Sequence, residues 1–271
     1  MPELPEVETV RRTLAPAMQG AKFTRVIVNR PDLRIPFPEK FIERLRGHSV
    51  TALARRGKYL TARLSSGETL IMHLGMSGWF HVAPTGDRSR EVDPHDHVIF
   101  VMSSGHIVVF NDPRRFGFMD LAARDRFEEY PSLRMMGPEP LSKDFDAASL
   151  ARACRAKRIS LKVALLDQRI VAGIGNIYAS EALHHARLSP LRKASSIATA
   201  SGKPKPQAKR LVEGVKAVLN AAIGRRESPY RSARFRVYER EGKQCLRPGC
   251  GGTIRRIPQA GRSTFYCPKC Q

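Results

Sequence analysis

Four cysteines near the C-terminal end of the chain have the spacing of metal ligands. Cys245 and Cys250 are separated by four residues, Cys267 and Cys270 by two, and sixteen residues lie between the pairs. Each pair can bind one side of a tetrahedral Zn²⁺, and the stretch between them is long enough for a hairpin. Four thiolates fill the coordination shell, so we expect a structural ion that folds a module too small for its own core. The alternative is two disulfides, which the lack of a secretory leader disfavours.

The opening "MPELPEVETV" carries a second group with reactive potential. Removal of Met1 would expose Pro2 as a secondary amine, and an α-amino group has a reference pKa of about 8. A fraction is therefore unprotonated near neutral pH and can attack a sugar carbon or a carbonyl. Glu3 beside it could deliver or accept a proton, although a helix N-terminus favours its carboxylate form. The alternative is that these residues only begin a helix.

The segment "VAGIGNIYASE" predicts a tight turn at Gly173 and Gly175 that leads into a helix. Tyr178 stands where a dinucleotide fingerprint has its third glycine and no strand precedes the turn, so a Rossmann dinucleotide-binding site is excluded. The first N–H groups of the helix, with the Asn176 side chain, could hold one phosphate. A plain glycine helix stop is the alternative.

Two glycine- or proline-containing loops carry large side chains that would face solvent. "HLGMSGWF" places Met76 between glycines, and "FNDPRRFGFMD" places Arg114 and Phe116 behind a proline turn. Exposed apolar side chains on turns can form a wedge that enters a base stack. The alternative is that Met76 and Phe116 are ordinary core residues.

Four further basic residues are candidates for contacts with an anion. Lys58 in "ARRGKYL" stands between a glycine and a strand, where its ammonium could point into a cleft. His95 and His97 alternate at strand spacing and so face the same side; without a third ligand nearby, phosphate contact or a structural role is favoured over a metal pair. Arg262 would occupy the turn of the hairpin between the cysteine pairs, where it suits a phosphate or is a solvated charge.

The periodicity of the chain changes twice. Apolar residues recur every three or four positions from Leu4 to Met18, which predicts a helix over 3–18. Residues 22–122 form short β-rich segments broken by turns, which predict a sandwich or flattened barrel of about eight strands. Helical patterns follow; they cover 147–156, 161–168, 176–186 and 204–223.

The sequence therefore predicts an α+β fold with three parts. An N-terminal two-layer β-sandwich with an N-terminal helix covers 1–125, a helical domain covers 130–225, and a cysteine-bearing module covers 237–271. A basic irregular stretch at 224–236 joins the last two.

The composition favours a polyanionic partner. Lys and Arg outnumber Asp and Glu by 47 to 25, for a formal charge of +22, and the basic residues recur in every segment. A charge of this size indicates nucleic acid before any other partner. The chain contains no apolar run of about 18 residues that would span a membrane.

Together these segments resemble the formamidopyrimidine-DNA glycosylase family of bacterial base-excision enzymes. The resemblance covers nearly the whole chain and rests on motifs in one order: "PELPEVETVRR", "RRGKYL", "HLGMSG", "HDHV", "DPRRFG", "LLDQ…VAGIGNIYASE" and "GRSTFYCPKCQ". It implies a β-sandwich, a helix–two-turn–helix DNA-binding domain and a zinc ribbon. It also implies a bifunctional enzyme that excises oxidised purines and cleaves abasic sites by β,δ-elimination through a Schiff base.

The resemblance assigns roles to individual residues. Pro2 would be the nucleophile at the anomeric carbon and Glu3 the proton donor, while Lys58 would act in base excision and β-elimination and Arg262 in δ-elimination and phosphate contact. The implied DNA-contacting positions are His95, Arg114, Lys157 and Asn176, with Lys162 as a further candidate, and the residues that fill the gap left by the everted nucleotide are Met76, Arg114 and Phe116.

The same resemblance predicts the surroundings in which the enzyme works. The expected partner is double-stranded DNA containing oxidised or abasic nucleotides, and the expected cofactor is one structural Zn²⁺. We expect a monomer in the bacterial cytoplasm, associated with the nucleoid through DNA and without membrane contact.

The sequence departs from the family pattern in two places. The first cysteine pair has four intervening residues where many relatives have two. The stretch "GRRESPYRSARF" replaces a longer glycine-rich segment that folds over 8-oxoguanine in relatives, so the lesion-capping loop at 224–236 is about ten residues short. Ring-opened purines and abasic sites remain expected substrates, and the preference for 8-oxoguanine is left open.

Two alternative functions follow. One is an endonuclease VIII-like preference for oxidised pyrimidines, which the short loop favours and the opening "PELPEVE" opposes. The other is a non-catalytic zinc protein that binds damaged DNA; it would need no free amine at Pro2.

Overall fold

The computed structural model describes residues 2–87, 91–123, 126–224 and 235–271 and divides into two compact units. The first unit contains Pro2 and Glu6–Arg134, and the second contains Glu3–Pro5 and Met135–Gln271. The residues that follow Pro2 thus belong with the second unit, although the helix that they begin continues into the first.

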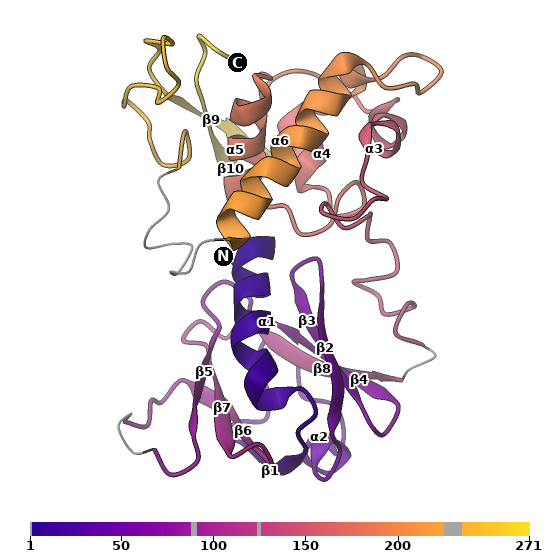
Figure 1. Cartoon of the computed structure of the whole chain (residues 1–271), viewed down its shortest axis with the longest axis vertical. Helices are drawn as coiled ribbons and strands as arrows, with labels where there is room; N and C mark the ends of the chain where they lie inside the picture. The colour runs from indigo at the N-terminus through magenta and orange to yellow at the C-terminus, as the bar shows by residue number, and fades with distance from the viewer. Residues whose placement is uncertain (1, 88–90, 124–125, 225–234) are drawn as a thin grey trace. The chain divides into compact units, whose positions relative to one another are not determined.

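The first unit is a β-sandwich of two four-stranded antiparallel sheets (Figure 1). One sheet has the order β1 (Phe23–Val28), β6 (Asp96–Met102), β7 (His106–Asn111) and β5 (Trp79–Pro84), and the other has the order β2 (Val50–Arg56), β3 (Tyr59–Leu64), β4 (Glu68–His73) and β8 (Phe118–Ala123). Alternate residues point inward, so that Phe23, Leu60 and Phe100 meet in a shared core. The predicted eight-stranded sandwich is confirmed.

Two helices accompany the sandwich. α1 (Leu4–Met18) matches the predicted helix and buries Val7, Leu14 and Met18 in the same core as the strands. α2 (Phe41–Leu45) was not predicted, because five residues are too few to produce a helical period.

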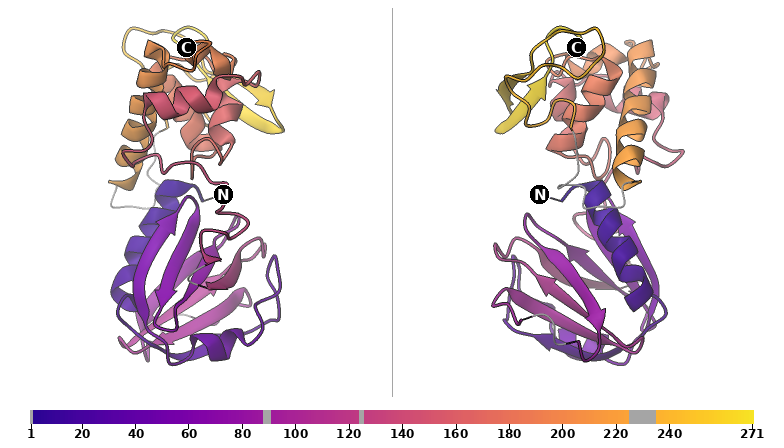
Figure 2. Two further views of the ribbon diagram at one scale, coloured as in Figure 1. Left: turned by 90° about the vertical axis from the view of Figure 1, so that its right-hand side faces the viewer. Right: turned by 60° about the vertical axis from the view of Figure 1, so that its left-hand side comes forward.

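The second unit is a helical module followed by a small ribbon (Figure 2). Its elements are α3 (Ala147–Cys154), α4 (Leu161–Leu166), α5 (Asn176–Ala186), the 3₁₀ turn η2 (Ala194–Ile197), α6 (Pro206–Ile223) and the hairpin strands β9 (Arg255–Gln259) and β10 (Arg262–Tyr266). Asp146 and Ser160 accept backbone N–H groups at the starts of α3 and α4, which fixes where those helices begin. α5 packs against both α6 and β10, so it forms the centre of the unit.

The hairpin differs from the prediction in one detail. The two-residue turn consists of Ala260 and Gly261, with φ of 48° and 71°, and Arg262 is the first residue of β10 instead of a turn residue. A two-residue turn with positive φ at both positions matches the right-handed twist of the two strands. Glycine adopts positive φ with the least steric strain. Arg262 is exposed at the end of the hairpin.

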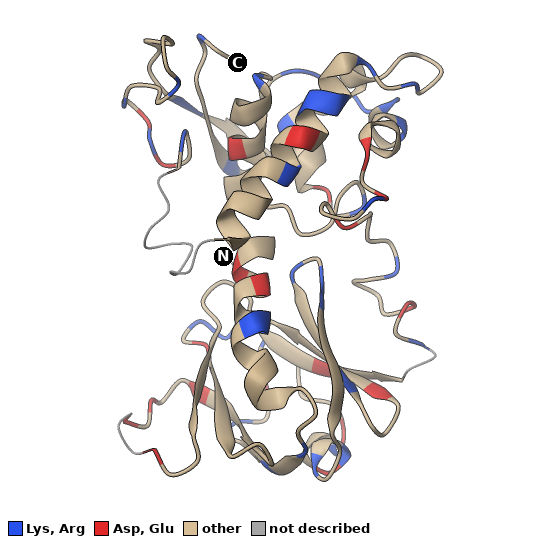
Figure 3. Cartoon of the chain, viewed as in Figure 1, with Lys and Arg blue, Asp and Glu red and all other residues tan. Residues whose placement is uncertain are grey.

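Lysine and arginine occur on helices and loops of both units (Figure 3). Among the described residues, no helix is both long and apolar enough to cross a bilayer.

Candidate active site and zinc site

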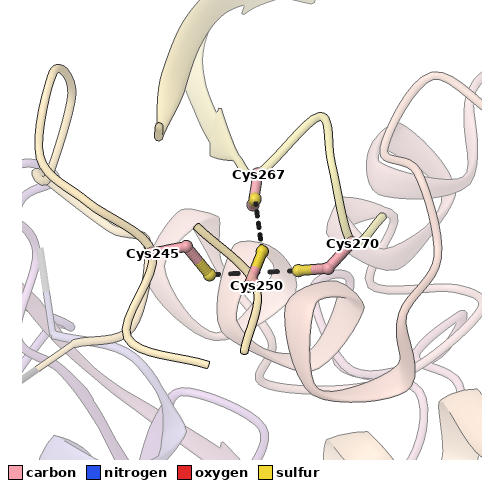
Figure 4. A group of neighbouring side chains, drawn as sticks. All are labelled: Cys245, Cys250, Cys267 and Cys270. Carbon is pink, nitrogen blue, oxygen red and sulfur yellow. Dashed lines mark hydrogen bonds between the residues drawn. The ribbon is translucent and has the colours of Figure 1, made fainter. Parts of the chain in front are cut away.

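The four cysteines predicted as metal ligands converge in the second unit (Figure 4). Their sulfur atoms all lie within 4.8 Å of one another, with Cys245 Sγ 3.9 Å from Cys270 Sγ and Cys250 Sγ 3.6 Å from Cys267 Sγ. Tetrahedral zinc with bonds of about 2.3 Å separates its sulfur ligands by about 3.8 Å, so the thiols fit one Zn²⁺. No pair is joined as a disulfide.

The backbone around these thiols is shaped for a metal site. N–H groups of Arg247 and Gly252 donate to the sulfurs of Cys245 and Cys250. A Cβ on Gly252 would come within 2.7 Å of Cys267 Sγ, so only glycine leaves room for the ligands. His184, which is buried on α5, has its Nε2 3.4 Å from Cys245 Sγ. This contact ties the site to the helical module.

Glu3 is buried against the N-terminus of α5, with 2% of its surface exposed. Its carboxylate accepts N–H groups from Gly175 and Ile177, both at 2.9 Å, and from Tyr178 at 3.3 Å. Orphan N–H groups and the helix dipole both stabilise an anion at this place. A phosphate on these N–H groups was one of two interpretations of the sequence; the structure contradicts it, because a carboxylate of the chain itself occupies them.

The glycine turn before α5 is built around Glu3 and Leu4. A Cβ on Gly175 would lie 2.4 Å from Glu3 Cδ, and Gly173, with φ of 75°, accepts the Leu4 N–H through its carbonyl. Gln168 fixes the turn from inside: its amide donates to the carbonyls of Leu166 and Ile174 and its oxygen accepts the Gly173 N–H. The turn predicted from "VAGIGN" is present, and it holds Glu3 in place.

Lys162 lies beside this anchor and was only a minor candidate from sequence. Its ammonium is fully buried and donates to Asn176 Oδ1, while the Asn176 amide donates to the Ser263 carbonyl on β10 at 2.8 Å. Burial, reinforced by the Arg262 charge and opposed by Glu3, lowers the pKa of Lys162 to about 8. A lysine partly deprotonated near neutral pH, between a buried carboxylate and an exposed arginine, is typical of a catalytic region.

In the first unit, the two loops predicted to carry a wedge are bound to each other. Asp112 accepts the Ser77 hydroxyl at 2.6 Å and the Gly117 N–H at 2.7 Å. The Arg114 N–H donates in turn to the Ser77 hydroxyl, and a Cβ on Gly75 would overlap the Phe116 backbone at 2.2 Å. The loops therefore form one rigid platform.

The platform exposes the side chains that the sequence singled out. Met76 is 41% and Phe116 44% exposed, so neither is a core residue. The Arg114 guanidinium lies 5.0 Å from the centre of the Phe116 ring, a cation–π contact. Exposed apolar groups held on a rigid support are suited to insertion into a partner.

Lys58 is connected to this platform through a histidine that sequence analysis missed. Lys58 follows Gly57 in the turn between β2 and β3. Burial, and next the positive charge of Lys58, lower the pKa of His73 to about 4. His73 is therefore neutral, and its Nδ1 accepts the Gly75 N–H at 3.0 Å. A single histidine on a strand gives no sequence signal for this role.

The remaining predicted DNA contacts are His95 in the first unit and Lys157 in the second. His95 precedes β6 and is exposed, whereas His97 is buried and bonds the Asp112 carbonyl through Nε2 at 2.9 Å, which makes it structural. Lys157 is half-buried after α3, where its carbonyl accepts the Ser195 N–H. The capping stretch at 224–236 falls almost wholly outside the described residues.

Comparison with known proteins agrees with this architecture. Family models match in three consecutive segments: the formamidopyrimidine-DNA glycosylase N-terminal domain over residues 1–119, its H2TH domain over 136–233, and the zinc finger found in FPG and IleRS over 242–271. Curated formamidopyrimidine-DNA glycosylases from Bradyrhizobium diazoefficiens and Rhodopseudomonas palustris (strain BisA53) are 55% and 53% identical, each over 100% of both chains.

Solved structures give the same result. The Lactococcus lactis enzyme bound non-covalently to DNA with an abasic site has a TM-score of 0.86 at 33% identity, and covers 100% of this chain and 99% of its own. The Thermus thermophilus MutM (Fpg) protein has a TM-score of 0.82 at 38% identity, with 100% and 98% coverage.

The sandwich, the helical module and the four-thiolate ribbon thus define a base-excision DNA glycosylase with lyase activity, built around one structural zinc ion. The chain belongs to the formamidopyrimidine-DNA glycosylase family.

Proposed function

We propose that this chain removes oxidised bases from double-stranded DNA and cleaves the resulting abasic site through the Pro2 nitrogen. The observation that carries the proposal is the anchoring of Glu3 by three N–H groups of α5 and its turn. This anchor holds the residue next to Pro2 in one position. A fixed neighbour is what a terminal amine needs in order to act as a positioned nucleophile.

The chemistry follows from a secondary amine. The Pro2 nitrogen bonds to the sugar C1′, the bond from C1′ to the base breaks, and the base leaves with a proton. The nitrogen loses its own proton, and an iminium forms as the C1′–O4′ bond opens and O4′ takes up a proton. Loss of a C2′ proton then expels the 3′ phosphate, and water releases Pro2.

Glu3 and Lys162 are the groups that we assign to proton movement near Pro2. Glu3 lies beside Pro2 in the chain, and three N–H donors hold its carboxylate in place, so it is positioned to pass a proton between Pro2 and the sugar. Lys162, with a pKa of about 8, can exist in either form at neutral pH. Lys58 is proposed to assist base excision and β-elimination, and Arg262 to contact phosphate and assist δ-elimination.

The substrate must leave the duplex stack before this chemistry begins. We propose that Met76, Arg114 and Phe116 fill the gap left by the everted nucleotide. The phosphate contacts are assigned to His95, Lys157 and Asn176. For Asn176 the contact requires exchange of a hydrogen bond, because its side chain already bonds Lys162 and Ser263. Such contacts provide binding that ignores sequence and weakens steeply with salt.

The lesion is proposed to be a ring-opened purine or an abasic site, with 8-oxoguanine as a weaker substrate. Related solved structures contain abasic DNA, carbocyclic 8-oxo-G DNA and DNA with an oxidised pyrimidine. The match to the Bradyrhizobium diazoefficiens enzyme spans 293 residues, 22 more than this chain contains. A shorter capping loop in this chain would contribute to this difference. The complex with an oxidised pyrimidine keeps an endonuclease VIII-like specificity as a second candidate.

We further propose a monomer that works in the bacterial cytoplasm and associates with the nucleoid through DNA. The bacterial origin of the relatives and the charge of +22 support this setting.

The deciding experiment is a panel of duplexes, each with one lesion, incubated with borohydride. A covalent adduct on formamidopyrimidine and abasic duplexes supports the proposal, and Pro2→Gly or an N-terminal extension should abolish it. If these variants still trap and nick DNA, Pro2 is not the nucleophile. A wild-type protein that binds every duplex without trapping would be the non-catalytic damaged-DNA-binding protein. Adducts confined to oxidised pyrimidines would favour the second candidate.

A further inference from the structure

Trp79 is an exposed aromatic residue to which the proposed function gives no role. It is the first residue of β5 and 41% of its surface is exposed. The next residue, Phe80, is buried and packs on Phe110 in the core at 5.0 Å between ring centres. Because neighbouring side chains on a strand point to opposite faces, the indole lies on the outer face of its sheet.

A buried polar chain fixes the orientation of this indole. Trp79 Nε1 donates to Asn111 Oδ1 at 3.0 Å, and the Asn111 amide donates to Asp96 Oδ1 at 2.9 Å. Asn111 and Asp96 are almost fully buried, and the His81 ring meets the indole edge-on at 6.3 Å. The polar atom of the indole is therefore satisfied inside the protein, and the exposed part of the side chain is apolar ring surface.

The indole belongs to the platform that carries Met76 and Phe116. Trp79 pairs with Asn111, the residue before Asp112, and Asp112 joins the two platform loops. Gly78, directly before Trp79, is packed so closely on Leu74 that a Cβ would lie 2.4 Å from its carbonyl oxygen. The rigid backbone thus runs without interruption from the platform to the indole.

The charge around the indole favours an anionic partner. Arg114, Arg115 and His95 are exposed at this end of the sheet, and the Asp112 N–H bonds the His95 carbonyl. Among the neighbouring carboxylates, Asp96 and Asp112 are buried and hydrogen-bonded, and Asp93 is half-buried and accepts the His95 N–H at 2.7 Å. An apolar ring within a basic surface is the combination with which proteins bind nucleic-acid strands.

We infer that Trp79 is a further DNA contact, whose ring packs against the duplex beside the gap filled by Met76 and Phe116. The inference rests on the proposed function, because it assumes that this platform meets DNA. The contact adds stacking area and no new charge, so it strengthens binding without changing its salt dependence.

The chain offers a direct test, since Trp79 is its single tryptophan. Titration of the wild-type protein with a duplex that carries a tetrahydrofuran abasic analogue should quench or shift the indole emission. In parallel, anisotropy of a labelled duplex reports affinity. Trp79→Ala should weaken binding about tenfold, within the range for loss of one stacked aromatic. Val92→Ala, at an exposed apolar residue outside the platform, should bind like the wild type.

Trp79→Phe separates a ring contact from a structural role. It keeps an aromatic surface but removes the donor to Asn111, so it should retain most of the affinity. Equal losses in Trp79→Phe and Trp79→Ala would mean that the bond to Asn111 matters and the inference is wrong. Duplex binding with unchanged emission and an unaffected Trp79→Ala would also overturn it, while leaving the proposed function intact. Absence of any duplex binding would instead overturn the proposed function.

Discussion

Two glutamates in the second unit, Glu3 and Glu181, have buried carboxylates that are stabilised in the same way but have different roles. Both are buried, and each accepts three backbone N–H groups. Glu3 binds the turn and first residues of α5. Glu181, within α5, binds the N–H groups of residues 236–238 at 2.9 Å, where the chain enters the ribbon. In both places the N–H groups repay the cost of burying a carboxylate.

The difference lies in what surrounds each carboxylate. Glu3 follows a potential amine nucleophile and shares its environment with Lys162 and Arg262. The side chain one helical turn beyond Glu181 is His184, which contacts a zinc-binding cysteine. Three N–H donors thus identify a buried carboxylate that fixes the backbone. Whether such a carboxylate is catalytic or structural depends on the residues around it.

Replacing each glutamate by glutamine tests this comparison most strongly. An amide turns an NH₂ group towards N–H donors, so both variants should lose stability, by about 1–3 kcal/mol. Only Glu3→Gln should also lose single-turnover cleavage of an abasic duplex, by roughly a thousandfold. Denaturant unfolding and cleavage rates, measured on zinc-loaded protein, separate the two effects. An equal loss of cleavage in folded Glu181→Gln would show that the distinction between the anchors is false.

The position of Glu3 can be disturbed without changing its chemistry. In Gly175→Ala the new methyl group would overlap Glu3 Cδ, and the carboxylate must move. A displacement of about 1 Å at a reacting centre costs roughly a hundredfold in rate. The matched control is Gly224→Ala, where φ is −73° and the nearest atom is the Asn220 carbonyl oxygen at 3.3 Å. If both variants cleave at the wild-type rate, precise placement of Glu3 is unimportant.

Lys162 extends the comparison to pH. Its charge acts on Glu3, whereas Glu181 accepts the N–H groups of residues 236–238, none of which is a lysine. The pKa of Lys162 is about 8 in the folded chain, below its ordinary value of 10.5. Between these values the unfolded chain binds the extra proton, so Lys162 makes the free energy of unfolding rise with pH, by up to about 3 kcal/mol. Below pH 8 its burial as a cation is a net cost.

The measurement compares the free energy of unfolding at pH 7.5 and 9.5 for wild type and Lys162→Met. Other groups also titrate between these pH values, but they do so in both proteins. The difference between the pH dependences of the two proteins therefore reports on Lys162. We expect the wild type to gain stability relative to the variant as pH rises. Parallel pH dependences would contradict a lowered pKa at this position.

The sequence was sufficient for most of the helices and strands and for the zinc ligands. Strand alternation, helical period and cysteine spacing are local signals, and the sandwich, α5 and the four thiols appear where those signals predicted them. Pro2 and Glu3 were singled out from their chemistry, but the partner of Glu3 was not. The sequence suggested the dipole of its own helix, whereas the actual N–H donors lie more than 170 residues away.

The residues that sequence analysis missed or ranked low are polar residues whose side-chain contacts the sequence does not show. Gln168 has no periodic signal, and His73 acquires its function only because β4 leads into the platform loop. Lys162 did give a signal: it interrupts the apolar run "ISLKVALL" on a helix whose other faces are buried. A charge within an apolar helix indicates a buried partner, though not which partner.

The smallest expected effect concerns His184, on the architectural side of the comparison. The contact between its Nε2 and Cys245 Sγ supports a zinc ligand from outside the metal shell, and loss of such support typically lowers metal affinity at least tenfold. His184→Ala should therefore speed transfer of zinc to a chromogenic chelator by about tenfold, while the borohydride adduct at Pro2 forms normally in zinc-replete protein.

His185→Ala is the matched control, because His185 is the next residue of α5 and is exposed. If the two variants release zinc equally fast, the bond to sulfur is incidental, and the other contacts of α5 with the ribbon, among them those of Asn176 and Glu181, hold it in place. If His184→Ala instead prevents adduct formation with zinc still bound, the two ends of α5 are coupled, and the division between a chemical and an architectural anchor must be abandoned.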